Sequence, residues 1–187
     1  MMKKLFPLFC LFSILLFTDC TKEEEDPCAG ITCENGGTCI NGTCDCPDMY
    51  EGADCSDQKT PQLIKITKIT VTNFPPLNNG DSWDAFDGPD IFIKLFYNSQ
   101  AIAESGPFEN ADSQVEYSWT VTNLNLIAPE DPYTIELYDY DDGVTADDLM
   151  GGYTFTPYSD TNGFPDKITL SEPGSSTSFV LELEYQF

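Results

Sequence analysis

The chain has 187 residues, of which 41% are hydrophobic and 13% aromatic, so it is long and apolar enough to bury a core. It carries 8 Lys+Arg against 32 Asp+Glu, which argues against nucleic acid as a partner, because phosphate binding needs a cationic surface. Histidine is absent from the sequence, which removes the commonest general base and leaves carboxylate chemistry, either hydrolysis by paired acids or binding of hard cations.

The first predicted element is an export signal. Two lysines precede an apolar run over residues 5–17, which is too short to span a bilayer, and Cys20 follows it. This stretch resembles the cleavage site of a bacterial lipoprotein, which implies that residues 1–19 are removed and that Cys20 is lipidated. Residues 20–27 are expected to form an acidic linker. Directly after Cys20 it reads TKEEED, which is similar to the export tag of Bacteroidetes surface lipoproteins. The resemblance implies a lipoprotein exposed on the outer membrane, and a plain secreted protein is the alternative.

Six cysteines then lie within residues 28–55, spaced C-x4-C-x5-C-x4-C-x-C-x8-C. So short a segment cannot stabilise itself by core burial, and an exported protein can form disulfides. We therefore expect three disulfides, although the number of cysteines alone does not determine their pairing. The motif ENGGTC, the C-x-C pair, and Tyr50 with Gly52 before the last cysteine resemble an EGF-like module. That resemblance implies pairing of Cys28 with Cys39, Cys33 with Cys44, and Cys46 with Cys55.

We expect no metal in this module. The residues before its first cysteine read EEEDPC, with Pro27 where calcium-binding EGF modules carry Glu or Gln. The module is therefore interpreted as a rigid spacer or as a small interaction domain.

After a linker at 56–61, residues 62–187 read as a single β domain. Alternation of apolar and polar residues over 115–122 and over 181–187 places one face of each strand on a core. In the first expected strand of this domain, residues 62–73, the positions of the apolar residues slip between Ile66 and Ile69, which predicts a β-bulge. About eight strands at this spacing predict an antiparallel β-sandwich. The other expected strands cover residues 62–73, 91–98, 100–104, 133–139, 151–156 and 166–170.

Two acid-rich stretches interrupt these strands, NNGDSWDAFDGPDIFIK and DYDDGVTADDLMG. The loops of a sandwich gather at its two ends, so both stretches can meet at one tip. Carboxylates brought together repel one another unless a divalent cation lies between them, and Ca²⁺ accepts six to eight oxygen ligands in flexible geometry. The site is not an EF-hand, because Val144 and Met150 stand where that loop needs Gly and Glu.

The spacing of these acids resembles that of a C2 domain. An Asp is followed six residues later by an Asp that leads into the strand IFIKLFY, and a D-x-D follows the strand IELY. Because the first acidic loop follows the first strand, the resemblance points to the phospholipase-type topology of the family. It implies calcium ligands at Asp84, Asp90, Asp139 and Asp141, with a last ligand at either Asp147 or Asp148.

Three functions remain. The preferred one is a surface-displayed module that binds calcium and mediates adhesion or binds a surface protein or glycan. The alternative is calcium-dependent binding to phospholipid, with Trp83, Phe86 or Val144 entering the interface. Residues 60–187 contain 4 Lys and 21 acids, however, which leaves no basic groove for phosphoinositides. A carboxylate hydrolase ranks third, and we expect no enzyme, since the acids have no second kind of catalytic group beside them.

Overall fold

The computed structural model describes residues 25–84, 87–141 and 146–187, so Cys20 and the export signal lie outside the described residues. No helix in the described part of the chain is long and apolar enough to cross a membrane. The first described segment is a small module of two short antiparallel sheets. Its strands are β1 (Thr38–Ile40), β2 (Thr43–Asp45), β3 (Tyr50–Glu51) and β4 (Asp57–Gln58), paired β1 with β2 and β3 with β4.

Disulfides replace a hydrophobic core in this module. Apart from Cys55, its side chains are exposed or half-buried, so apolar burial contributes little to holding the two sheets together. The disulfides join Cys28 to Cys39, Cys33 to Cys44, and Cys46 to Cys55, which are the pairs that the EGF-like resemblance implies.

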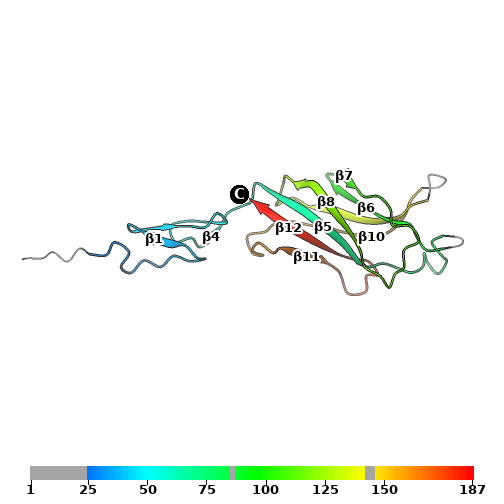
Figure 1. Cartoon of the computed structure of the whole chain (residues 1–187), viewed down its shortest axis with the longest axis horizontal. Coiled ribbons are helices and arrows are strands. Elements are labelled where there is room, and N and C mark those ends of the chain that lie inside the picture. The colour runs from blue at the N-terminus through cyan, green and yellow to red at the C-terminus, as the bar shows by residue number, and fades with distance from the viewer. Residues whose placement is uncertain (1–24, 85–86, 142–145) are drawn as a thin grey trace, which may run out of the picture.

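The rest of the chain forms the predicted antiparallel β-sandwich of two four-stranded sheets (Figure 1). One sheet has the order β10-β9-β6-β7 and the other β11-β12-β5-β8. The strands are β5 (Leu63–Asn73), β6 (Ile91–Tyr97), β7 (Gln100–Glu104), β8 (Tyr117–Leu126), β9 (Tyr133–Asp139), β10 (Asp148–Phe155), β11 (Lys167–Leu170) and β12 (Ser178–Gln186). The fold class predicted from the sequence is therefore confirmed, and the first acidic loop does follow the first strand of the sandwich.

Alternation along the strands explains the core. In β9 the side chains of Tyr133, Ile135 and Leu137 are buried, while the residues between them are half-exposed. Ile64, Ile66 and the apolar residues of β12 line the facing sheet. The interior is therefore built from the inward face of each sheet, as the period-two pattern predicts.

The predicted bulge in the first strand is confirmed. The pairing of β5 with β8 shifts between Ile66 and Lys68, and the pairing of β12 with β5 shifts between Glu182 and Leu183. Relative to β12, Thr67 is the extra residue, and it lets Ile66 and Ile69 both face the core although they are an odd number of positions apart.

Lysines on the outer face of the second sheet are ion-paired with acids. Lys65 pairs with Glu184, while Lys68 and Lys167 both pair with Glu182, at N–O distances of 3.1 to 3.6 Å. These residues lie opposite one another on neighbouring strands. Since residues 60–187 have 21 acids and 4 Lys, most of the negative charge of the sandwich has no lysine to balance it.

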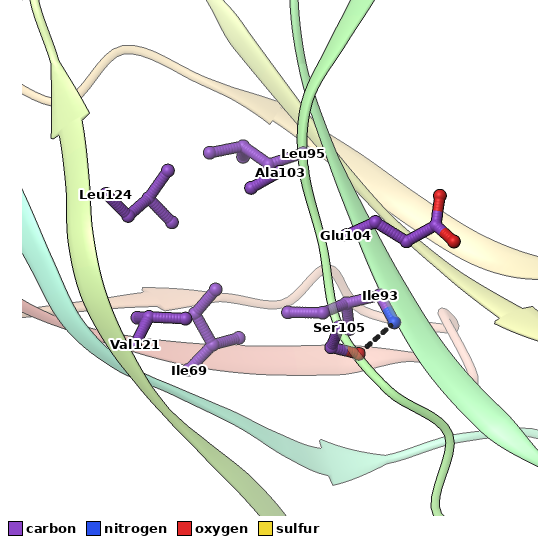
Figure 2. A pocket seen from close by; sticks show the side chains of 8 residues that line it. All are labelled: Ile69, Ile93, Leu95, Ala103, Glu104, Ser105, Val121 and Leu124. Atoms are coloured by element: carbon purple, nitrogen blue, oxygen red, sulfur yellow. Dashed lines mark hydrogen bonds between the residues drawn. The ribbon is translucent and has the colours of Figure 1, made fainter.

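A small apolar cavity of about 30 Å³ lies between the two sheets, on the side where the edge strands β7 and β8 face each other (Figure 2). Glu104 and Ser105 stand at its rim, and Ser105 is fixed because its Oγ accepts a hydrogen bond from the Ile93 N–H at 3.0 Å. The lining residues are Ile69, Ile93, Leu95, Ala103, Glu104, Ser105, Val121 and Leu124.

Filling this cavity should stabilise the sandwich. We expect Ala103→Val to raise the free energy of unfolding by about 0.7 kcal/mol, because empty core volume costs roughly 24 cal/mol per Å³. Ala101→Val is the control, since Ala101 lies on the same strand but is exposed. Urea unfolding of both variants measures the difference, and equal gains would assign the effect to β propensity and not to the cavity.

Candidate functional site

The two acidic loops meet at the end of the sandwich that lies away from the disulfide-rich module (Figure 1). The register of β6 and β9 brings them there, because Ile91, at the start of β6, pairs with Asp139, at the end of β9. The Asp90 N–H donates to Oδ1 of Asp139 at 2.8 Å, and the Tyr140 N–H donates to the Asp90 carbonyl at 2.9 Å. Backbone pairing therefore holds the first loop against the second.

Asp139 is the most deeply placed acid of this tip. It continues the buried side of β9 and is 1% exposed. Its Oδ2 is buried without a hydrogen-bond partner among the described residues. Burial raises the pKa of Asp139 from 3.8 to about 6, and the charges of Asp84, Asp141 and Asp90 also raise it, against a lowering by the Asp90 N–H. An unpartnered carboxylate oxygen thus faces a strongly negative environment.

The acids around Asp139 come from both loops. Asp84 and Asp90 belong to the first loop and Asp141 to the second, and all three are half-buried. Asp90 is held in place by the Asn110 N–H, which donates to its Oδ1 at 2.8 Å. The structure therefore brings together four of the residues that the sequence singled out. We call this group, namely Asp84, Asp90, Asp139 and Asp141, the acidic tip.

The structure separates the two candidates for the last ligand. Asp147 lies on the outer face of the sheet, where Nζ of Lys94 is 3.1 Å from its Oδ2. The same Nζ lies 4.8 Å from the ring centres of Phe92 and Tyr138 on that face. Asp148 pairs directly opposite Asp139 in the register of β9 and β10, and residues so paired point to the same face of a sheet. Asp148, and not Asp147, is on the side of the acidic tip.

Sequence reasoning missed Asn78, which links the first loop to β10. Its Nδ2 donates to Oδ2 of Asp148 at 3.3 Å. Asn78 and Asp81 form an antiparallel bridge across a tight turn in which Asn79 and Gly80 have φ values of 53° and 106°. An Asn-Gly pair is the usual sign of such a turn, so the turn could have been found in the sequence, although its contact with Asp148 could not.

Of the three hydrophobic residues expected at the loop ends, only Trp83 lies within the described residues. Trp83 is half-buried, packs against the core, and donates its Nε1–H to the Pro75 carbonyl at 2.8 Å. In this position it closes the sandwich beneath the loop. Phe86 and Val144 lie outside the described residues.

The acidic tip fits a hard cation by the chemistry of its donors. Within the ranges 25–84, 87–141 and 146–187, no three acids form an assembled metal cluster. The buried Oδ2 of Asp139 nevertheless lacks a partner in that part of the chain, and the carboxylates that act on it supply only oxygen donors. Oxygen donors in flexible loops are the ligands that Ca²⁺ prefers, whereas zinc favours nitrogen and sulfur.

Comparison with known proteins identifies the disulfide-rich module. Residues 27–55 match the family described as the EGF-like domain. The match begins one residue before the first cysteine and ends at the last. No curated protein matches the chain.

Comparison with solved structures returns C2 domains for the sandwich. A structure described as that of a C2 domain has a TM-score of 0.43 and 15% identity, and the match covers 67% of this chain and 98% of that one. A C2 domain of plant Extended Synaptotagmin 1 has a TM-score of 0.39 and 18% identity, with 68% and 97% of the two chains covered.

Human GIVD cytosolic phospholipase A2, solved with methyl gamma-linolenyl fluorophosphonate inhibitor and terbium chloride, is also similar. Its TM-score is 0.45 and its identity 12%, and the match covers 68% of this chain but only 18% of the phospholipase. The chain therefore contains a segment that matches the EGF-like domain family, followed by an antiparallel β-sandwich.

Proposed function

We propose that the acidic tip binds calcium and that the calcium-loaded tip mediates adhesion to, or binding of, a surface protein or glycan. The residues that would hold the ion are Asp84, Asp90, Asp139, Asp141 and Asp148. Calcium would place a positive charge among these carboxylates and offset their mutual repulsion.

One observation carries the proposal. Oδ2 of Asp139 is buried without a partner in the described part of the chain, and acids from both loops act on it. A buried carboxylate oxygen left in this state costs free energy, and a bound cation removes that cost. All four lysines of the sandwich are engaged with Glu side chains or with Asp147, and none of these ion pairs involves the acidic tip.

A specific observation favours adhesion over membrane insertion. Trp83, the described aromatic residue of the first loop, points its indole N–H to Pro75 and packs on the core. It is therefore not available as a membrane wedge in this arrangement. We propose binding as the role of the tip, because its described side chains are carboxylates with no second kind of catalytic group among them.

The first test is a thermal melt of residues 25–187 with intact disulfides, in calcium and in chelator. Calcium at a hundred times its Kd should stabilise the fold by about 2.7 kcal/mol and raise Tm. Asp141→Asn should lose most of this rise, whereas Asp166→Asn, an exposed acid that precedes β11, should keep it. Equal melting curves with and without calcium would remove the proposal.

Sedimentation with phosphatidylserine vesicles then separates the two surface functions. Calcium-dependent sedimentation would assign the tip to phospholipid, and a Tm rise without sedimentation favours a protein or glycan ligand.

We further propose that the chain is attached to the outer membrane through lipid on Cys20, in keeping with the lipoprotein-like signal. Incorporation of a labelled fatty acid into the chain tests the anchor, and its absence would favour the secreted form.

A further inference from the structure

The connection between the EGF-like module and the sandwich is short and restrained at both ends. The Lys59 N–H donates to the Met49 carbonyl at 3.0 Å within the module. Three residues later the Gln62 N–H donates to the Gln186 carbonyl at 2.7 Å within the sandwich. Pro61, between them, is buried and has a fixed φ. Little of the connecting backbone is left to act as a hinge.

An aromatic contact joins the two domains at the junction. Phe164 lies at the centre, with its ring 5.9 Å from that of Tyr50 in the EGF-like module. On the sandwich side its ring centre lies 5.2 to 5.5 Å from three other aromatic rings. We call this group the junction cluster; its members are Tyr50, Tyr158, Phe164, Tyr185 and Phe187.

Buried groups lie on both sides of the junction. Tyr158 is 2% exposed, and burial raises its pKa, as do the charges of Asp160, Glu130 and, least, Glu51 of the EGF-like module. Oε1 of Gln58, on the last strand of that module, is also buried. The ring of Tyr50 meets that of Phe164 edge to face, with an interplanar angle of 83°, and such a directional contact restrains the angle between the domains as well as their distance.

The junction cluster and the acidic tip lie at opposite ends of the sandwich (Figure 1). Strand β5 connects them, since it starts one residue after Gln62 and ends at Asn73, five residues before the first acidic stretch begins at Asn78. Its eleven residues span about 36 Å at about 3.3 Å per residue. The EGF-like module and the loops after β5 and β9 therefore lie at opposite ends of the sandwich (Figure 1).

We propose that the junction cluster fastens the EGF-like module to the sandwich as one rigid rod. The rod holds the acidic tip at the end of the sandwich remote from the EGF-like module, so a chain anchored at Cys20 would present the tip to a facing surface. That placement of the ligand rests on the proposed function of the tip and on the proposed anchor, whereas the rigid junction rests on neither.

The experiment measures rigidity in chelator, so it is independent of calcium. Backbone ¹⁵N relaxation of residues 25–187 should give one rotational correlation time for both domains. Phe164→Ala should split it into a faster value for the EGF-like module and a slower one for the sandwich. Phe96→Ala is the control, because Phe96 is also half-buried but lies on the outer face of β6. It should leave a single correlation time.

Two results would overturn the proposal. One is separate correlation times in the unmodified chain, and the other is an unchanged single value in Phe164→Ala with both domains folded by their amide spectra. Should Phe164→Ala unfold the sandwich, Tyr50→Ala removes the same contact from the EGF-like side. A rod that is confirmed in chelator, together with no calcium effect on Tm, would leave the junction standing and remove only the function of the tip.

Discussion

In chelator at neutral pH, Asp139→Asn should be more stable than the unmodified chain by roughly 1 to 2 kcal/mol. The reason is the cost of the buried charge. The pKa of Asp139 is raised from 3.8 to about 6 by burial and by the neighbouring acids. A difference of about two pKa units corresponds to roughly 3 kcal/mol of destabilisation of the ionised form. Asparagine removes the charge but places an amide N–H where Oδ2 lacks a partner, and that loss offsets part of the gain.

The sign can be checked by changing pH. Because the folded-state pKa of Asp139 is higher than its unfolded value of 3.8, the folded state binds a proton that the unfolded state has released between pH 3.8 and about 6. The contribution of Asp139 to the free energy of unfolding therefore falls as pH rises through this window and is level above it. Asp139→Asn should lack this contribution, so the two chains should differ least near pH 4.

Calcium should make the unmodified chain more stable than Asp139→Asn, the reverse of the order expected in chelator. At a thousand times its Kd the ion adds about 4 kcal/mol to the unmodified chain, and much less to a variant that lacks a central ligand. Urea unfolding in calcium and in chelator measures both differences in one series. A variant that is less stable than the unmodified chain in chelator would show that Oδ2 of Asp139 is satisfied in solution, and it would remove the main support for a metal at the tip.

The order of the elements could be predicted from the sequence because strand patterning is local. Alternation located the strands, and the phase slip between Ile66 and Ile69 located the bulge, since a buried face forces side chains to alternate. The meeting of Asp90 and Asp139 followed from the rule that sandwich loops gather at the ends. These features need only short-range pattern and general topology.

The contacts that complete the site could not be predicted in this way, because they join distant parts of the chain. Lys94 and Asp147 are 53 residues apart, and Asn78 and Asp148 are 70 apart. Which acid faces the tip depends on the register of β10, and a shift by one residue turns every side chain to the other face. The aromatic junction was missed for the same reason, since Tyr50 and Phe164 have no shared pattern in the sequence.

Gly151→Ala is the second substitution with a large expected effect, because Gly151 lies at the β-bulge that follows Asp148 in β10. The register shifts between Leu149 and Gly151, and Gly151 has φ of 149°. A Cβ there would lie 2.4 Å from Oγ1 and 2.9 Å from Cβ of Thr177. Thr177 is 2% exposed and donates its hydroxyl to the Met150 carbonyl at 3.1 Å, so it has no free space to move into.

We expect Gly151→Ala to lower the free energy of unfolding by about 3 kcal/mol, from steric overlap together with backbone strain. The calcium-dependent rise in Tm should also shrink, because the bulge fixes the register that places Asp148 on the side of Asp139. Gly106→Ala is the control, since its added Cβ meets nothing within 4 Å, and it should change stability by less than about 0.5 kcal/mol.

Combining Gly151→Ala with Thr177→Ala distinguishes overlap from strain. Removing the hydroxyl relieves the closest contact of the new Cβ, so the double variant should be more stable than the sum of the two single effects predicts. Strictly additive effects would assign the loss to backbone strain alone. If Gly151→Ala proves neutral in urea unfolding, the bulge tolerates a side chain, and the expected overlap with Thr177 is wrong.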